Sequence, residues 1–391
     1  MNKPFDLVVF GASGYTGRLV AEHLAHQAPP DLRWALAARD ASRLQAVHRD
    51  LHLPDAVACL TVDANDASSL QSLMAQTRLV ITTVGPYQLY GSALVAACAQ
   101  AGVDYVDLCG EPAWMRKMID AHEAEARASG ARIVFSCGFD SIPFDLGVWL
   151  LQAQMRQQHG RAASQVHGRV LRMKGTFSGG TAASLRATLA AARSDPSVMA
   201  LLRDPFSLTP GFQGPAQPAG HKPLYDERMG CWLAPFVMAD INTRNVHRSN
   251  LLQGHAYGAD FRYDEMLVTG PGEAGQARAH AVAADRSLAS DEGPRPGEGP
   301  TREEREAGLY ELLFVGRDDA GHEAHVRVTG DRDPGYGSTS KMVAEAALCL
   351  LSRDRGVTPG GIWTPAAAMG QDLIERLKAR AGLTFEAVSP G

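Results

Sequence analysis

The sequence predicts an α/β protein in which a doubly wound parallel sheet is followed by a second, mostly antiparallel region. Three observations support this fold class. Apolar strand-like runs alternate with helical patterns up to about residue 145, a glycine-rich turn joins the first strand to the first helix, and the rhythm changes after Trp149. Because the chain has 391 residues, it is too long for one compact core, and two domains are expected.

The first element is an apolar strand at residues 5–10, which runs into the turn Gly-Ala-Ser-Gly-Tyr-Thr-Gly and then into a helix near residues 14–26. The spacing is G-x-x-G-x-x-G, yet the glycines can act as in the commoner G-x-G-x-x-G. They permit a tight turn, let backbone N–H groups approach a pyrophosphate, and let the helix pack on the strand. An ordinary strand-to-helix turn is the alternative, and the flanking pattern favours the dinucleotide site. The residues expected to bind the cofactor phosphates are Gly11, Ser13, Gly14, Tyr15, Thr16 and Gly17.

The second strand, at residues 32–38, precedes the residues that choose between NAD and NADP. An acidic residue about twenty positions past the glycines bonds the ribose 2′-hydroxyl of NAD, whereas an arginine accommodates the 2′-phosphate of NADP. Arg39 stands 22 positions beyond Gly17, and Arg43 follows one helical turn later. Asp40 complicates the choice, since its carboxylate is placed either to contact a ribose or to cap the next helix. NADP is therefore favoured, and NAD is the less favoured alternative.

The rest of the parallel sheet follows in order. Further strands are expected at 58–62, 79–84, 104–108 and 132–137, with helices near 40–50, 66–76, 91–101 and 112–129. Asp63, after the third strand, is expected near the adenine, and a helix cap or turn is its structural alternative. Val84, Gly85 and Pro86, at the end of the fourth strand, are expected beside the nicotinamide ribose.

Two polar clusters follow the fifth and sixth strands, at residues 107–111 and 136–145. Both fall at the carboxyl edge of the predicted sheet, where ligands bind. Acid and hydroxyl groups there can orient a substrate or relay a proton. Capping of the next helix by Asp140 or Ser141 explains the same pattern.

The remaining chain is expected to form a second domain and a helical tail. Gln165–Lys174 alternates like a strand, a helical run covers Ala182–Arg193, and 204–230 is a Pro- and Gly-rich loop or lid. Strand-like segments lie near 232–240, 245–252, 255–263, 308–316 and 322–330, an exposed loop is expected at 289–300, and helices are expected at 340–352 and 365–381 with a turn at Gly360-Gly361.

Composition and charge exclude several classes of protein. With a net charge of −5 and no basic run, the chain does not have the pattern of a nucleic-acid-binding protein. The six cysteines are scattered without a C-x-x-C pair, and the thirteen histidines form no ligand motif, so no metal site is predicted. No secretory signal or apolar run of 18 residues is visible, which predicts a cytoplasmic protein with membrane contact only at its surface.

Motifs along nearly the whole chain resemble the saccharopine dehydrogenase-like oxidoreductases, and within them the trans-acting enoyl reductases. The most particular of these motifs is Gly-Phe-Asp-Ser-Ile-Pro at 138–143, whereas the glycine turn is common to many reductases. The other motifs are 85–87, 107–111, 174–175 with 178–181, 333–336, 344–350 and 364–370.

The resemblance implies a Rossmann NAD(P)-binding domain at 1–145, an inserted α+β substrate or dimerisation domain at 146–330, and C-terminal helices at 331–391 that pack back on the first domain. It also implies hydride transfer to a C=C or C=N bond, with a small-molecule or lipid-like substrate. Some relatives carry a membrane-associating segment, but the matching region at 266–288 is broken by charged residues. A homodimer is one option for the oligomeric state.

An enoyl reductase needs a proton donor beside the site of hydride transfer. Tyr87, Asp140, Tyr336 and Lys341 are the candidates, and a structural role is an alternative for each. Two other functions stay open. A saccharopine-type imine reductase predicts paired basic residues facing the cleft, and a sensor or scaffold binds NADP without turning it over.

Overall fold

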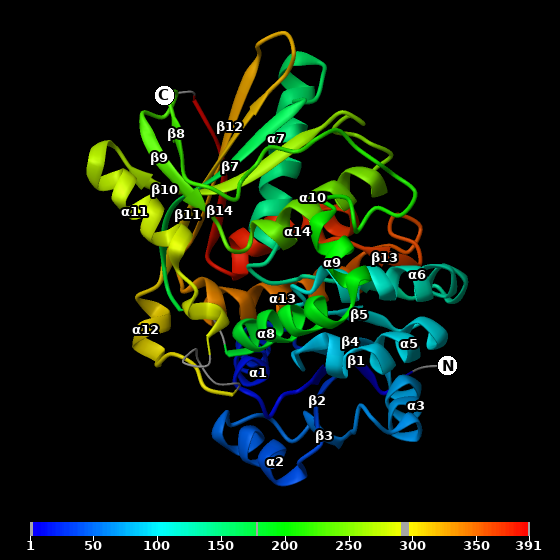
Figure 1. Cartoon of the computed structure of the whole chain (residues 1–391). Helices are drawn as coiled ribbons and strands as arrows, with labels where there is room; N and C mark the ends of the chain where they lie inside the picture. Colours follow the sequence, from blue (N-terminus) through cyan, green and yellow to red (C-terminus); the bar gives the residue numbers. More distant parts are fainter. Residues whose placement is uncertain (1–2, 177–178, 291–296, 390–391) are drawn as a thin grey trace.

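The computed structural model describes residues 3–176, 179–290 and 297–389, and the strands of these residues form two seven-stranded sheets (Figure 1). Sheet A has the order β13-β6-β5-β4-β1-β2-β3, and its paired strands are parallel. Its strands are β1 (Phe5–Phe10), β2 (Trp34–Ala38), β3 (Ala58–Thr61), β4 (Thr77–Thr82), β5 (Asp104–Val106), β6 (Arg132–Val134) and β13 (Gly361–Trp363).

The order of sheet A reverses between β1 and β4. From β1 the chain builds outward through β2 and β3, then returns to the other side of β1 and continues through β4, β5 and β6. Leu7 pairs with Trp34 on one side and with Leu79 on the other, and Leu7 is fully buried because helices cover both faces. A reversal of this kind leaves a crevice at the carboxyl ends of the strands, where dinucleotides bind.

Helices of the N-terminal part follow the expected boundaries closely. They are α1 (Tyr15–Gln27), α2 (Ala41–Asp50), α3 (Ala67–Gln76), α4 (Tyr87–Tyr90), α5 (Ser92–Ala101) and α6 (Pro112–Ser129). Local chemistry explains these ends. Asp40 and Asp66 cap α2 and α3 with their carboxylates, while Gly102 and Gly130 take the left-handed conformation after α5 and α6.

Sheet B has the order β14-β12-β11-β7-β10-β9-β8, and its strands are antiparallel except for the pair β7 and β10. The strands are β7 (Gln165–Lys174), β8 (Leu224–Asp226), β9 (Cys231–Pro235), β10 (Arg262–Gly270), β11 (Leu309–Arg317), β12 (Glu323–Gly330) and β14 (Leu383–Val388). The other helices are α7 (Ile142–His159), α8 (Gly179–Ser194), α9 (Pro196–Arg203), α10 (Ala239–Leu252), α11 (Gly272–Ala284), α12 (Arg302–Glu306), α13 (Thr339–Ser352) and α14 (Pro365–Arg380), with a 3₁₀ turn at Ser287–Ala289 and a π-helical turn at Pro334–Ser338.

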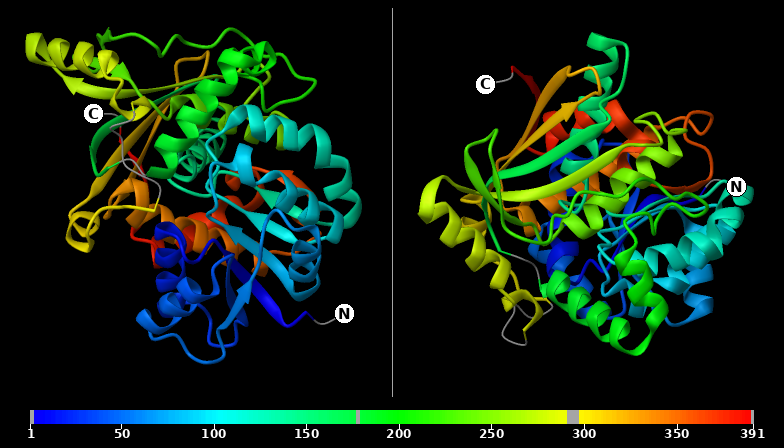
Figure 2. Two further views of the ribbon diagram at one scale, coloured as in Figure 1. Left: turned by 60° about the horizontal axis from the view of Figure 1, so that its bottom comes forward. Right: turned by 45° about the horizontal axis from the view of Figure 1, so that its top comes forward.

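A helical layer of α7, α13 and α14 lies between the two sheets (Figure 1). Helix α13 packs on β4 and β5 of sheet A, α7 packs on β11 and β12 of sheet B, and α14 contacts both helices. Helices α8 and α9 leave sheet B and lie against α4 and α6 of the N-terminal part, as the two views of Figure 2 show. The inserted region therefore covers the carboxyl edge of sheet A.

Two expectations for the second domain are wrong. Residues 245–252 lie in helix α10, not in a strand, and 255–263 is mostly a loop that leads into β10. The pattern misleads because α10 is buried with its polar side chains bonded to other elements. For example, Asn245 donates to Ser141 Oγ at 2.8 Å, and Arg248 donates to the Ile362 carbonyl at 2.6 Å.

The tail contributes a strand to each sheet in addition to its two helices. Gly361, expected in a turn, begins β13, which pairs with β6 of sheet A, and β14 pairs with β12 of sheet B. The exposed loop expected at 289–300 falls partly outside the described residues, since 291–296 are not described.

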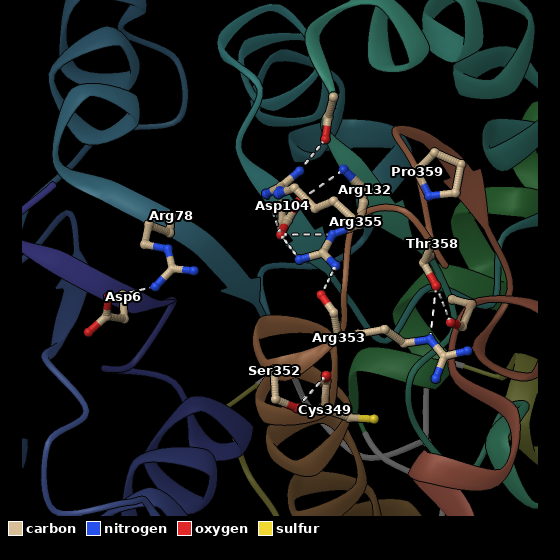
Figure 3. Close-up of polar contacts among 12 residues, drawn as sticks. Asp6, Arg78, Asp104, Arg132, Cys349, Ser352, Arg353, Arg355, Thr358 and Pro359 are labelled. Atoms are coloured by element: carbon tan, nitrogen blue, oxygen red, sulfur yellow. Dashed lines mark hydrogen bonds and ion pairs between the residues drawn. The ribbon is translucent and has the colours of Figure 1, made fainter. Parts of the chain in front are cut away.

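An ion-pair cluster anchors the tail to the amino edge of sheet A (Figure 3). The buried Asp104 carboxylate accepts hydrogen bonds from Arg132 Nε at 3.1 Å and from Arg355 Nη2 at 3.0 Å. Arg132 also donates to the Arg353 carbonyl at 2.9 Å. Asp104 and Arg132 begin their strands, so this cluster lies at the edge opposite the cofactor crevice.

Candidate active site

The glycine turn after β1 has the geometry that a dinucleotide requires. Gly11 has a φ of +90°, which favours glycine, and a Cβ on Gly17 would lie 2.2 Å from the Gly11 carbonyl oxygen. Gly14 precedes helix α1 and has no side chain to cap it. The first N–H groups of α1 are therefore available to an anion, as a bound pyrophosphate requires.

The other predicted phosphate-binding residues, Ser13, Tyr15 and Thr16, lie in the turn and at the start of α1. Thr16, in the first turn of α1, lines the central cavity. Ser13 is half-buried within the turn itself. The Tyr15 hydroxyl donates to the Pro300 carbonyl and accepts from Arg305 Nη1, so the inserted region contacts α1 at its start.

The residues predicted to choose between NAD and NADP lie in an exposed position after the end of β2. Asp40 caps α2, since its Oδ1 accepts from the backbone N–H groups of Ser42 and Arg43 at 3.0 Å each, which confirms the capping alternative. Arg39 and Arg43 are both exposed there and fit a phosphate. Asp63 accepts from the Asn65 N–H at 2.9 Å in a turn after β3.

A cavity of about 270 Å³ lies between sheet A and the inserted region. Residues at the ends of β4, β5 and β6 form one wall, and helices α8 and α10 form the other. Gly85 lines the cavity, Val84 packs where a Cβ on Gly11 would lie, and Pro86 precedes α4. The apolar part of the lining includes Leu108, Leu185, Leu202, Val237, Met238 and Ile241.

Asp140 and Tyr87 are the predicted proton donors that line the cavity. Burial raises the pKa of Asp140 to about 7. Among the described residues, no hydrogen bond or ion pair holds its carboxyl group. The Tyr87 hydroxyl, in contrast, donates to the Thr82 carbonyl at 3.2 Å and accepts from the Leu108 N–H at 3.0 Å, and burial raises the pKa of this tyrosine well above its usual value.

Tyr336 and Lys341, the other two predicted proton donors, are not among the described residues that line the cavity. The Tyr336 hydroxyl donates to the Glu298 carbonyl at 2.9 Å and accepts from the Gly179 N–H at 3.0 Å, while its ring packs edge-on against Tyr15. Lys341 is not part of the cavity lining within the described chain. Burial lowers the pKa of Lys341, and its charged neighbours are Asp331, Arg332 and Glu306.

The two polar clusters divide into structural and cavity-facing residues. Asp107 is fully buried and accepts from the Tyr105 hydroxyl at 2.8 Å and from the Ser136 N–H at 2.9 Å, and burial raises its pKa to about 7. Asp145 accepts from Ser249 Oγ at 2.6 Å. Asp107 therefore holds the loops after β5 and β6, and Asp145 joins helix α7 to α10, whereas Asp140 faces the cavity.

Sequence reasoning missed the individual importance of Glu111 and Thr339. Glu111 accepts three hydrogen bonds at the boundary between the two domains. Thr339 Oγ1 accepts from the Phe139 N–H at 3.0 Å and donates to the Pro334 carbonyl at 2.8 Å, so it supports the turn that carries Asp140. The position of Glu111 in the polar cluster that follows the fifth strand was the available signal.

Metal binding and membrane crossing have no structural signature in the described part of the chain. In the described ranges no group of three or more His, Cys, Asp or Glu side chains is arranged to hold a metal ion. Likewise, no helix of the described segments has both the length and the apolar character needed to cross a bilayer.

Sequence comparisons with known proteins agree with a dinucleotide-binding site at this edge of sheet A. The family described as saccharopine dehydrogenase NADP binding domain matches residues 7–134, which confirms NADP as the expected cofactor. A trans-acting enoyl reductase of Mycobacterium tuberculosis H37Rv is 38% identical over 405 residues, with 96% of both chains covered. A second protein of that strain is 41% identical over 411 residues, covering 98% of this chain and 97% of its own. A trans-acting enoyl reductase of Mycobacterium leprae is 36% identical over 406 residues, again covering 96% of each.

A solved structure shows the same fold at lower similarity. The apo saccharopine dehydrogenase (L-Glu forming) from Saccharomyces cerevisiae superposes with a TM-score of 0.57 at 11% identity. The match covers 98% of this chain and 100% of the yeast chain. The predicted arrangement of a Rossmann sheet, a second sheet and returning helices is thereby confirmed.

Proposed function

This chain belongs to the saccharopine dehydrogenase-like oxidoreductases, in the group of the trans-acting enoyl reductases, and from that premise we propose its reaction. The protein uses NADPH to reduce the C=C bond of an α,β-unsaturated ester, thioester or related lipid-like acceptor. The single observation that carries the proposal is the cavity between the domains. It combines an apolar lining with the carboxyl group of Asp140, which has no partner among the described residues, at the carboxyl edge of sheet A.

The residues around the crevice fit the cofactor. Backbone N–H groups at the start of α1 bind the pyrophosphate, and the close approach at Gly17 keeps the helix against the turn. Arg39 and Arg43 would hold the 2′-phosphate, and Gly85, which lines the cavity, would face the nicotinamide side of the cofactor. When bound, NADPH supplies the hydride.

Asp140 supplies the proton in the proposed reaction. Hydride addition at the β-carbon leaves negative charge on the carbonyl oxygen and α-carbon, so the substrate then needs a proton. A carboxyl group with a pKa of about 7 is partly protonated near neutral pH and suits this task. The apolar wall formed by α8 and α10 excludes water and contacts the lipid-like part of the acceptor.

The charges of the cavity distinguish this reaction from reduction of an amino-acid imine. The charged lining side chains within the described residues are Asp140 and Asp240, both acidic. Carboxylates repel the anionic groups of a saccharopine-type substrate, whereas an uncharged enoyl acceptor is not affected. A sensor that binds NADP without turnover remains the second candidate, because a Rossmann domain by itself does not fix activity.

A titration followed by a turnover assay tests the proposal. NADPH and NADH are each titrated while the nicotinamide fluorescence is recorded, and NADPH oxidation is then followed with enoyl esters, enoyl-thioesters and imines. We expect NADPH to bind more tightly than NADH and an enoyl compound to be the preferred acceptor. Failure to bind either cofactor would contradict the cofactor assignment, and tight binding without oxidation by any acceptor would favour the sensor.

The oligomeric state and location are further proposals. A homodimer would agree with the expected dimerisation role of the inserted region, and light scattering coupled to gel filtration measures it. A cytoplasmic location, with contact at a membrane surface only, would place the enzyme beside a lipid-like acceptor, and cell fractionation tests it.

A further inference from the structure

Glu111 is a buried carboxylate that joins the two domains beside the cavity. It is 1% exposed and stands directly before helix α6. Its Oε1 accepts from the Tyr87 N–H at 2.8 Å and from Ser184 Oγ at 2.7 Å, and its Oε2 accepts from the Gln88 N–H at 2.8 Å. The three donors come from elements on both sides of the cleft.

The donors belong to the two walls between which hydride transfer would occur. Tyr87 and Gln88 begin α4, immediately after the turn that contains Gly85, so the carboxylate fixes the turn on the cofactor side. Ser184 belongs to α8, which forms part of the opposite wall, and it lines the cavity itself. A single side chain therefore ties the cofactor turn to the substrate-facing helix.

A neighbouring contact supports the same alignment. Gln88 Nε2 donates to Thr188 Oγ1 on α8 at 3.1 Å, one turn beyond Ser184. Glu111 forms the larger part of the link, since its carboxyl group accepts three hydrogen bonds whereas the Gln88 side chain donates one to α8. Domains within a chain move relative to each other by default unless such contacts restrain them.

A role in capping alone would not explain the Ser184 contact. A carboxylate that only capped a helix would need the two backbone N–H donors of α4. The third donor arrives from a residue 73 positions away in the sequence and from the other domain. The side chain is therefore placed to transmit the position of α8 to the cofactor turn.

We propose that Glu111 is a positioning residue for hydride transfer, which sets the distance between the nicotinamide side of the cleft and the acceptor held against α8. The inference rests on the proposed reductase function, because it concerns the geometry of that reaction. Misplacement of reacting groups by about 1 Å can lower a rate by about 10²-fold. Loss of Glu111 should therefore slow the chemical step more than it weakens cofactor binding.

The test compares Glu111→Gln with Ser184→Ala and Ser184→Thr, using the full chain, NADPH and the best acceptor from the turnover panel. The amide introduced by Glu111→Gln keeps one acceptor oxygen but turns an NH₂ group toward a backbone donor. We expect Glu111→Gln to lower kcat by about 10²-fold while the NADPH Kd changes by less than about threefold. Ser184→Ala removes the hydrogen bond to Glu111 and should lower kcat by about tenfold. Ser184→Thr keeps a hydroxyl group at this position and should have a kcat close to that of the wild type.

Glu123→Gln is the matched control. Glu123 also joins distant elements, since it accepts from the Ile362 N–H at 3.1 Å and contacts Arg248 at 3.4 Å, but it does not line the cavity. The control should lower thermal stability and leave kcat unchanged. The deuterium isotope effect on kcat, measured with NADPH labelled at the transferred C4 position, should rise in Glu111→Gln and stay constant in Glu123→Gln.

The outcomes separate this inference from the proposed function. A wild-type protein that reduces no acceptor would overturn the proposed function and this inference with it. A wild-type protein that turns over, together with a Glu111→Gln variant whose kcat and isotope effect match those of Glu123→Gln, would overturn the positioning role alone. If Glu111→Gln is unstable, a low kcat in Ser184→Ala together with a nearly wild-type kcat in Ser184→Thr would still support the positioning role.

Discussion

Asp140 is the single residue whose surroundings bear most directly on the chemistry. Burial raises its pKa to about 7, so the group is protonated and able to donate below that pH and ionised above it. We expect kcat to fall as the pH rises through about 7. Asp140→Asn should lower kcat by about 10²- to 10⁴-fold and remove this pH dependence, as steady-state pH profiles would show.

Asp240→Asn is the matched comparison for Asp140. Asp240 also lines the cavity, but its side chain is 70% exposed and forms an ion pair with Arg244 at 3.7 Å. Its substitution should alter kcat far less. If Asp140→Asn keeps the wild-type pH profile, another group supplies the proton.

We also expect single side chains to decide the choice of cofactor. Arg39 is exposed after β2, where a guanidinium can pair with the 2′-phosphate. Arg39→Asp should weaken NADPH binding by about 10- to 100-fold and NADH binding much less, because only NADPH loses a charge-assisted contact. Fluorescence titration measures both constants. If the binding of NADPH and NADH weakened equally, a residue other than Arg39 would determine the choice of cofactor.

The same scale shows what the sequence could and could not predict about the site. The tight turn at Gly11–Gly17 could be predicted because it depends on neighbours along the chain, whereas the role of Arg39 stays a prediction. Glu111 could not, since its third donor, Ser184, comes from the other domain. The hydrogen bonds of the Tyr87 hydroxyl could not be predicted from the sequence either, because they depend on how β4 and β5 pair.

At the scale of elements, the turn between β1 and α1 depends on close packing. A Cβ on Gly17 would lie 2.2 Å from the Gly11 oxygen and 2.8 Å from Ala12 Cα, which are backbone atoms that cannot move aside. Gly17→Ala should therefore shift α1, lower the free energy of unfolding by about 1–3 kcal/mol and weaken NADPH binding. Thermal unfolding and fluorescence titration measure the two effects.

Gly110→Ala controls for the substitution itself. Apart from the two adjacent residues, no described residue has an atom within 4 Å of a Cβ built at Gly110, so the stability of this variant should change little. A Gly17→Ala variant as stable as Gly110→Ala, with unchanged NADPH affinity, would show that the turn tolerates a side chain.

Elements of the parallel sheet were predictable, whereas several later ones were not. The first six strands were recognised because buried parallel strands are continuous apolar runs bounded by caps and glycines, as at β1 and α2. Helix α10 was mistaken because it buries polar residues, such as Asn245, whose amide group donates to the distant Ser141. Strands β13 and β14 were missed because they follow helical tail segments, and it is their pairing with β6 and β12 that defines them.

At the scale of the whole molecule, Asp104 holds the tail to sheet A. Its buried carboxylate bonds the buried Arg132 and the half-exposed Arg355 (Figure 3). Asp104→Ala would leave the Arg132 guanidinium buried without its partner, and the free energy of unfolding should fall by about 3–5 kcal/mol. Chemical denaturation measures this loss. NADPH affinity should remain unchanged, because the cluster lies at the opposite edge from the cofactor; a parallel loss of affinity would contradict that separation.

The two tail strands also determine when the molecule can finish folding. Strand β13 covers one edge of sheet A and β14 covers one edge of sheet B, and both follow residue 360 in the sequence. A nascent chain still attached to the ribosome at that point exposes the edges of β6 and β12 simultaneously. Open strand edges are templates for pairing with other chains. A C-terminal truncation before residue 361 would leave both edges open permanently, so we expect such a variant to pair with other chains.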